Sequence, residues 1–538
     1  MFSQLLQNLI ADVTGPGFQF FRTELWLSGT IVLMLLIRLC SVDRIIPTFI
    51  VALVGAGLAG WSAFGQFEFL VGQETDYSVA FLGGMLRQDL FSVFFRIFLS
   101  LFLILTIALT VLTGIPDNED APDFYSLLVG ATIGMMMMAS ANNLLMLFLG
   151  VEMASVPSYA MVGFLKGRKP SSEAALKYVV YGAGAAGVML YGISLVAGVL
   201  GTTDMPSMAS HLGKLSTDGI AGLADAEVRL VALGAMLVMV GLAFKLSLVP
   251  FHFWAPDAFE GASAEVAGFL SVASKAGAFG LLVRFSVCLS GPETAGLMTA
   301  FGIGLGVIAI LTTTFGNLAA YTQSNLKRLL AYSTIAHAGY MLMAVAALLV
   351  MLNSDRADAL GQEINACVGG LLYYLAVYLF MNLGAFAVIA LVRNYTFDED
   401  IKSFKGLVTQ SPALAVTIAI CLFSLIGMPP FGGFFAKFMI FASVFKAAQI
   451  HWSMYLVLAV GGLNTVFSLF YYVRILKAMF LEERPDDARR VPVPGMEGSY
   501  ALVLAGMVLA LGLWPGLISG LNTIADQAGN AVLSVVGG

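Results

Sequence analysis

Apolar residues occur along this chain in long stretches separated by short polar segments. Each stretch approaches or exceeds the roughly 20 residues that a helix needs to cross the hydrocarbon core of a bilayer. The pattern therefore predicts an all-α polytopic membrane protein with about fourteen transmembrane helices. The expected spans are roughly 24–40, 46–65, 88–112, 124–140, 142–165, 173–200, 229–250, 262–288, 296–320, 328–352, 364–392, 411–447, 453–480 and 498–520.

Prolines interrupt two of these spans. The seventh runs into LVPFHFWAP at Leu248–Pro256, and the twelfth contains GMPPFGG at Gly427–Gly433. Proline removes a backbone donor and clashes with the preceding turn. Broken backbone persists at membrane depth only where protein or a water-filled cavity satisfies the freed groups. We therefore expect helices 7 and 12 to be discontinuous.

Matching short motifs indicate an internal repeat. Pairs that share an offset near 180 residues are Pro250-Phe251 with Pro430-Phe431, Asn143-Leu144 with Asn325-Leu326, and Tyr159 with Tyr340. The offset predicts that helices 4–8 are repeated as helices 9–13. Because five is odd, the second copy is inverted, as in many transporters. The expected segments are 1–123 with helices 1–3, 124–288 with the first repeat, 296–480 with the second, and 481–538 with a loop and helix 14.

The composition is that of a membrane protein and argues against a soluble or a nucleic-acid-binding protein. Hydrophobic residues make up 59% of the 538 residues and charged residues only 11%, against about 25% charged residues in soluble domains. The mean hydropathy is +0.89. The net charge of -6 and the lack of a long basic run argue against nucleic acid as a partner.

The cysteines and glycines give no sign of a cofactor. Cys40, Cys288, Cys367 and Cys421 are far apart, so we expect no metal, haem or iron–sulfur site and assign all four as small buried apolar residues. The GxGxxG match at 182–187 lies within a span without a preceding strand, which excludes a dinucleotide site. The first twenty residues contain no Lys or Arg, so we expect the first span to be retained rather than cleaved as a signal.

The distribution of Lys and Arg predicts the orientation. Loops on one side carry fifteen of them and loops on the other side six. Lys327 and Arg328 are counted among the richer loops. Because the cytoplasmic side carries the excess, both termini are expected on the non-cytoplasmic face.

Charged residues within spans are the candidate functional residues, because a charge at membrane depth is costly. Glu152 lies in the middle of the fifth span, Lys245 just before the first break, Lys275 halfway along the eighth span, and Lys437 just past the second break. Desolvation favours a neutral lysine and a nearby carboxylate favours a charged one, so such a group can take and release protons. Lys437 does not occupy the repeat position of Lys245, which falls near 425, so the repeat is expected to be chemically asymmetric.

Four further residues are weighed against simpler roles. His337 is a histidine well inside a span and suits proton transfer. Lys177 lies near the start of its span, where snorkelling to the interface competes with function. Arg96 and Arg284 lie near span ends, and for these we favour snorkelling or lipid contact. We assign no role to the segment 201–227.

Several of these motifs resemble one family. Their sequences are GLAFKLSLVPFHFWAPD at 241–257, EGA at 260–262, LGVE at 149–152, LKRLLAYS at 326–333 and GMPPFGGF at 427–434. The chain resembles the antiporter-like membrane subunits of proton-translocating NADH–quinone oxidoreductase, respiratory complex I, from about residue 20 to 520. Three details favour subunit N: Lys245-Leu246-Ser247 before the break, a lysine rather than a glutamate at 437, and no long lateral helix after the last span.

The resemblance implies a mechanism and its partners. Glu152 would modulate the charge of Lys245, Lys275 and His337 would continue a hydrated row, and Lys437 would release protons to the outer face. Other membrane subunits, lipids and protons would be the partners. NADH, FMN, iron–sulfur clusters and quinone would serve the whole complex, with no redox site in this chain.

Two other classes of protein remain as alternatives. A subunit of a monovalent cation/proton antiporter, or of a membrane-bound hydrogenase, would use the same fold and relay. A membrane-embedded enzyme acting on lipids, or a scaffold, is less consistent with the sequence. Such an enzyme would cluster catalytic groups near one interface, whereas these charges lie deep and on several helices.

Overall fold

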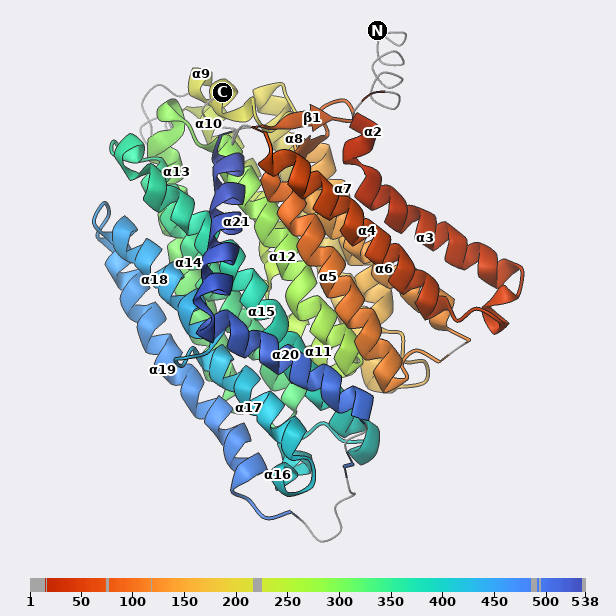
Figure 1. Ribbon diagram of the computed structural model, residues 1–538. Coiled ribbons are helices and arrows are strands. Elements are labelled where there is room, and N and C mark those ends of the chain that lie inside the picture. The colour runs from red at the N-terminus through yellow and green to blue at the C-terminus, as the bar shows by residue number, and fades with distance from the viewer. Residues whose placement is uncertain are drawn as a thin grey trace.

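A computed structural model of the chain describes residues 15, 17–73, 77–117, 119–215, 225–484, 491–492 and 495–534. Most of these residues are helical (Figure 1). The described α-helices are α2 (Gly17–Phe20), α3 (Arg22–Leu39), α4 (Thr48–Val71), α5 (Leu90–Thr113), α6 (Ala121–Ser140), α7 (Leu144–Val162), α8 (Lys169–Leu200), α9 (Met208–Leu215), α10 (Ala226–Leu246), α11 (Trp254–Gly261), α12 (Ala264–Leu289), α13 (Ala295–Ala320), α14 (Leu326–Leu352), α15 (Gly361–Thr396), α16 (Leu407–Gln410), α17 (Pro412–Ile426), α18 (Gly432–Ala448), α19 (Ser453–Phe480), α20 (Gly495–Leu513) and α21 (Pro515–Leu533). One hairpin, β1 (Val79–Phe81) with β2 (Leu86–Gln88), precedes α5.

The prediction of fourteen membrane crossings is confirmed. Within the described residues, twelve helices are long and apolar enough to span a bilayer. The first expected span is α3, whose 18 residues include three charged ones. The twelfth is divided into the shorter helices α17 and α18. Together these helices account for all the expected spans.

Successive crossings alternate in direction through the bundle. The described chain begins with α2 and ends with α21 at the same end, where α9 also lies, whereas α16 lies at the opposite end (Figure 1). The last crossing is made by α20 and α21 in succession, which meet at Pro515. The expectation that both ends of the chain lie on one face therefore fits the fold, while the identity of that face stays a prediction. The first fourteen residues lie outside the described part of the chain.

Three helices form the centre of the bundle. Every residue of α12 is buried, and nearly all of α14 and α15 is buried too. These helices are apolar all round, as expected for helices surrounded by other helices rather than by water. The few polar groups on them are thus held in an apolar setting, where they need protein partners or trapped water.

The two predicted breaks are present at equivalent positions. Helix α10 ends at Leu246, earlier than the expected end near 250, and α17 ends at Ile426. Ser247 and Gly427 then adopt left-handed conformations with φ of 57° and 88°. A left-handed residue commonly ends a helix because it turns the chain away from the last carbonyls. Those carbonyls are left without helical partners near the middle of the bundle.

The inverted repeat is visible in the way α7 and α14 begin. Asn143 and Asn325 are the N-caps of these helices, and each side chain accepts a hydrogen bond from a backbone N–H of the first turn. Each asparagine also forms an isolated antiparallel bridge, with Asp204 and Asp400 respectively. The first bridge lies near α9 and the second near α16, at opposite ends of the bundle (Figure 1).

Arg96 and Arg284 contradict the expectation of snorkelling or lipid contact. Arg96 Nε lies 2.7 Å from Glu24 Oε1, and both side chains are fully buried. Arg284 forms a two-pronged pair with Asp89 at 2.8 and 3.0 Å and donates from Nε to the carbonyl of Ala139. These pairs join helices that are distant in sequence, so the arginines serve helix packing.

The cysteine assignment needs one correction. Cys288, Cys367 and Cys421 are buried, as expected, but Cys40 is exposed. Cys40 follows the last residue of α3 and lies at the helix end rather than in the bundle. The glycines of the segment 182–187 differ in their surroundings. A Cβ on Gly182 would collide with Tyr159, whereas Gly184 and Gly187 face open space.

Replacing Arg96 by Met is expected to destabilise the protein by about 3–5 kcal/mol, because it leaves the Glu24 carboxylate buried without its counter-ion. The double variant Arg96→Met/Glu24→Leu replaces the pair with apolar side chains and is expected to recover most of that loss. Thermal unfolding of the purified protein in detergent measures both. A double variant as unstable as the single one would show that the arginine acts through its other contacts.

Candidate functional site

Glu152 and Lys245 approach each other from α7 and α10. Lys245 is 1% exposed, and its Nζ donates to Ser155 Oγ at 3.0 Å. Ser155 lies one turn beyond Glu152 on α7, so both face α10. Glu152 is half-buried and close enough to Lys245 to act on it electrostatically. No direct ion pair joins the two within the described residues, so the serine hydroxyl is the group that holds the ammonium.

Lys275 closes the broken end of α10. Its Nζ donates to the carbonyl of Leu246 at 2.8 Å and to Ser247 Oγ at 3.2 Å. Leu246 is the last residue of α10 and the neighbour of Lys245 in sequence. The ammonium thus satisfies a carbonyl that the break leaves free, at the negative end of the helix dipole.

Lys437 makes the same arrangement in the second repeat. Its Nζ donates to the carbonyls of Leu425 and Ile426 at 3.0 and 2.9 Å, at the end of α17. Ile426 is 180 residues after Leu246, which accepts from Lys275. Lys437 is therefore not the counterpart of Lys245, as expected, but its ammonium occupies a position equivalent to that of Lys275. The two ammonium groups occupy equivalent positions although one comes from α12 and the other from α18.

His337 lies in a cluster of tyrosines between these lysines. Its Nδ1 is 2.6 Å from the hydroxyl of Tyr374. Its ring packs against Tyr378 at 5.2 Å and Tyr340 at 5.9 Å between centroids. Lys437 Nζ lies 4.6 Å from the centre of the Tyr340 ring. The imidazole is therefore linked to Lys437 through an aromatic ring and to α15 through a hydroxyl.

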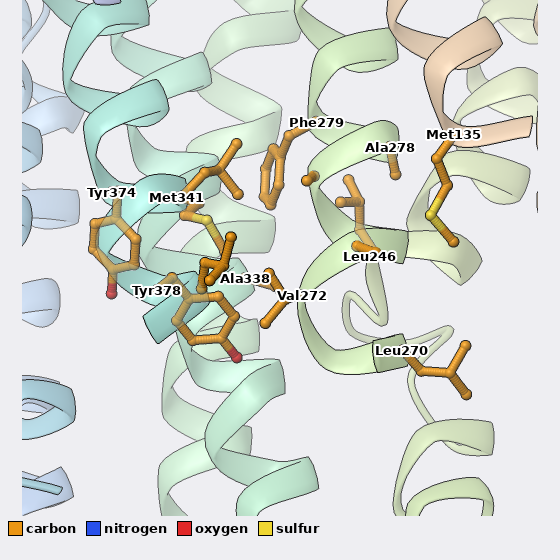
Figure 2. Packing of buried hydrophobic residues seen from close by; sticks show 14 of the residues in the cluster. Met135, Leu246, Leu270, Val272, Ala278, Phe279, Ala338, Met341, Tyr374 and Tyr378 are labelled. Atoms are coloured by element: carbon orange, nitrogen blue, oxygen red, sulfur yellow. The ribbon is translucent and has the colours of Figure 1, made fainter. Parts of the chain in front are cut away.

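The region between Lys275 and His337 is largely apolar. Figure 2 shows Val272, Met341 and Ala338 gathered with Tyr378 between α12, α14 and α15. One polar link crosses it: Asn382 on α15 donates from Nδ2 to Ser271 Oγ on α12. Polar contacts therefore accompany the ionisable groups within each repeat, whereas few polar groups lie in the described region between the two repeats.

Lys177 lies outside this row. It is 42% exposed and pairs with Glu173 at 2.7 Å and Asp257 at 2.8 Å. Arg328 joins the same group through Asp257 and Glu260. This is a network of ion pairs at the surface of the bundle, away from Lys245, Lys275 and Lys437. Its participation in ion transfer stays a prediction.

Several polar partners could not be recognised from composition alone. Tyr374, Tyr378 and Asn382 come from α15, which carries no acidic or basic residue between Glu363 and Arg393. Ser155 could have been found, because its spacing from Glu152 puts the two on one helix face. Lys327 was assigned to a loop, but it is 1% exposed and pairs with Glu399 at 2.9 Å.

The chemistry of the row suits proton transfer. Lysine amines, an imidazole and tyrosine hydroxyls each exchange a proton with a neighbouring oxygen or nitrogen. No group of three or more His, Cys, Asp or Glu side chains converges as a metal site in the part of the chain that the structure describes.

Comparisons with known proteins give consistent matches. The model of the NADH:quinone oxidoreductase/Mrp antiporter transmembrane family matches residues 141–468. NADH-quinone oxidoreductase subunit N from Anaeromyxobacter sp. (strain Fw109-5) is 39% identical over 81% of this chain and 83% of its own. Subunit N 2 from Chloroherpeton thalassium is 36% identical over 99% and 98%. A chain of respiratory complex I from Thermus thermophilus, solved with bound aureothin, is 29% identical with a TM-score of 0.72, over 94% of this chain and 99% of that one.

Replacing Ser155 by Ala is expected to lower the free energy of unfolding by about 1–3 kcal/mol, because it leaves the buried Lys245 ammonium without its hydroxyl acceptor. Ser158→Ala is the matched control. That hydroxyl is also buried on α7, but it bonds only to the carbonyl of Ala154, which keeps its helical partner. Denaturant unfolding of the two variants gives the comparison, and equal losses would contradict the role of Ser155.

Proposed function

The chain belongs to the family of NADH-quinone oxidoreductase subunit N, and from this membership we propose that it is a proton-translocating membrane subunit of that oxidoreductase. Electron transfer in other subunits would drive protons through the row of buried groups. The observation that carries the proposal is the placement of Lys275 and Lys437. Both buried ammonium groups bind the free carbonyls at the ends of broken helices. These two helix ends, at Leu246 and Ile426, are 180 residues apart in an inverted repeat.

The surroundings of each lysine in the row accommodate both its charged and its neutral form. As an ammonium it is held by carbonyls and hydroxyls, and as a neutral amine it suits the surrounding apolar side chains. Moving Glu152 toward Lys245 favours the ammonium, and moving it away favours loss of the proton. A small displacement of α7 against α10 would thus change the charge of Lys245. The proton then passes to Lys275, whose ammonium donates to the carbonyl of Leu246, the residue after Lys245 in the sequence.

Transfer between the repeats runs through His337. The proton leaves Lys275 and reaches the imidazole across the polar link of Asn382 with Ser271. The hydroxyls of Tyr374 and Tyr472 lie at 2.6 and 3.5 Å from the two ring nitrogens. An imidazole takes a proton on one nitrogen and releases it from the other. Lys437 then accepts the proton and releases it toward the outer face.

The source of energy lies outside this chain in this proposal. NADH, FMN, iron–sulfur clusters and quinone are the cofactors of the whole complex and would be bound by other subunits. The chain would act as a subunit of a translocase with other membrane subunits and lipids as its neighbours. It would lie in the bacterial inner membrane, with both termini on the non-cytoplasmic face.

A subunit of a cation/proton antiporter is the alternative. The matching family model covers both kinds of protein, and the same buried row would exchange sodium or potassium for protons. The named relatives favour the oxidoreductase, because both are NADH-quinone oxidoreductase subunits N and one aligns over nearly its whole length.

The central test replaces Lys245 by Ala in membrane vesicles energised with NADH. Proton pumping and quinone reduction are both expected to fall, pumping by roughly 10²-fold, the usual contribution of a positioned proton-transfer group. Lys402→Ala is the control, because that lysine is 69% exposed in a loop. If NADH oxidation is unchanged and only sodium- or potassium-driven proton exchange is lost, the antiporter function replaces the proposal.

Replacing Glu152 by Ala tests the control of Lys245. Without the carboxylate, Lys245 loses the negative charge that favours its protonated form. Pumping per NADH is expected to fall about tenfold, while the assembled complex keeps its subunits. The measurement is the ratio of protons moved to NADH oxidised. A normal ratio in this variant would remove Glu152 from the mechanism.

A further inference from the structure

A second group of ionisable residues, two of them buried and two partly buried, lies where the first repeat meets the second. It consists of Glu265 at the start of α12, Lys327 at the start of α14, and Arg393 and Glu399 at the end of α15. None of these residues belongs to the row described above. All lie at the end of the bundle that carries most of the Lys and Arg loops.

Glu265 is the unusual member of this group. Its side chain is 0% exposed, and neither carboxylate oxygen has a hydrogen-bond partner among the described residues. A buried carboxylate normally receives donors or a counter-ion, because its desolvation is otherwise costly. A buried polar group without such partners in a native protein is commonly retained for a function.

Lys327 provides the nearby proton donor. Its Nζ lies 2.9 Å from Glu399 and 2.5 Å from the carbonyl of Ala262, three residues before Glu265. Its bond to Ala262, in the turn that precedes α12, places it beside the start of the helix that carries Glu265. Glu399 is 15% exposed and lies 3.7 Å from Arg393. Through Glu399 the group reaches the surface, while Glu265 forms its inner end.

The charges of the group fit a carboxyl that changes state. Lys327 and Arg393 carry two positive charges, and Glu399 carries one negative charge. An ionised Glu265 makes the group neutral, and a protonated Glu265 leaves it with a single excess positive charge. Neither state of the carboxyl leaves a large uncompensated charge in the group.

The structure assigns Glu265 as the residue that takes protons from this end of the bundle and passes them to Lys275. In the first step an N–H bond of Lys327 breaks as an O–H bond forms on an intervening water, an O–H bond of that water breaks as one forms on the Glu265 carboxylate, and Lys327 regains a proton from the surface through Glu399. In the second step the O–H bond of Glu265 breaks as an N–H bond forms on the neutral amine of Lys275. The inference rests on the proposed function and adds a second supply of protons to Lys275, beside the transfer from Lys245.

The route from Glu265 to Lys275 follows α12. The two residues are ten positions apart, or about 15 Å along the helix axis. Ser271 lies between them and accepts from Asn382, whose Oδ1 has no partner among the described residues. Such groups are the ones that bind buried water. Water molecules at these groups would carry the proton over the intervening distance.

The experiment measures proton transport and NADH oxidation by vesicles that contain the whole complex. Glu265→Gln keeps the size of the side chain but cannot carry a proton, and Glu265→Asp keeps the acid one methylene further back. Glu260→Gln is the matched control, because that side chain is nearby but 42% exposed and paired with Arg328. Lys275→Ala is measured in parallel.

The expected result is a fall of about tenfold in protons moved per NADH for Glu265→Gln, a smaller fall for Glu265→Asp, and no change for Glu260→Gln. If Glu265→Gln pumps normally while Lys275→Ala does not, Glu265 is not the entry residue and the proposed function stands. If Lys275→Ala also pumps normally, the proposed function fails. Should Glu265→Gln not assemble, Glu265→Leu takes its place, and a normal ratio in that variant overturns the inference.

Infrared difference spectra of the complex during turnover give a readout that a merely structural role would not change. Protonation of Glu265 predicts a carboxylic C=O band that is sensitive to D₂O. The band is expected to shift in Glu265→Asp and to vanish in Glu265→Gln, and it should persist in Glu260→Gln. A band unaffected by all three substitutions would overturn the inference.

Discussion

The fold depends on a mutual satisfaction between broken helices and buried ammonium groups. A helix that ends inside a membrane leaves carbonyls without donors, and a lysine buried among apolar helices lacks acceptors. At the ends of α10 and α17 the ammonium groups of Lys275 and Lys437 donate to the free carbonyls, so that both donor and acceptor are satisfied. The same contacts that stabilise the breaks therefore also hold the two buried ammonium groups in place. Neither the prolines alone nor the lysines alone would be tolerated at this depth.

The inverted repeat places these two sites in equivalent settings with opposite directions. The caps at Asn143 and Asn325, with their bridges to Asp204 and Asp400, mark the corresponding ends of the two copies. The equivalence is not complete, because α12 supplies the lysine in one copy and α18 in the other. Lys245 has no counterpart near 425, so the first copy carries an additional buried lysine, which lies near Glu152.

Charged residues outside this row have other roles in the structure. Arg96 with Glu24 and Arg284 with Asp89 fasten the first helices of the chain to the bundle through fully buried pairs. The network of Lys177 with Asp257 and Arg328 joins α8, α11 and α14 at the surface. The group around Glu265 differs from both, because it contains a buried acid without a fixed partner. Burial by itself therefore does not distinguish a structural charge from a functional one.

The sequence by itself determined the number of membrane crossings, the two breaks, the inverted repeat and the identity of the deep charges. Each of these follows from a local property: the length of an apolar run, a proline within it, or a charge far from its ends. Only the tertiary structure decided which partner each charge has. Arg96 meets a glutamate 72 residues away, and Arg284 meets an aspartate 195 residues away, so neither reaches the lipid interface. The equivalence of Lys275 and Lys437, the exclusion of Lys177 from the row and the burial of Lys327 likewise depend on helices meeting across the bundle, which no local pattern encodes.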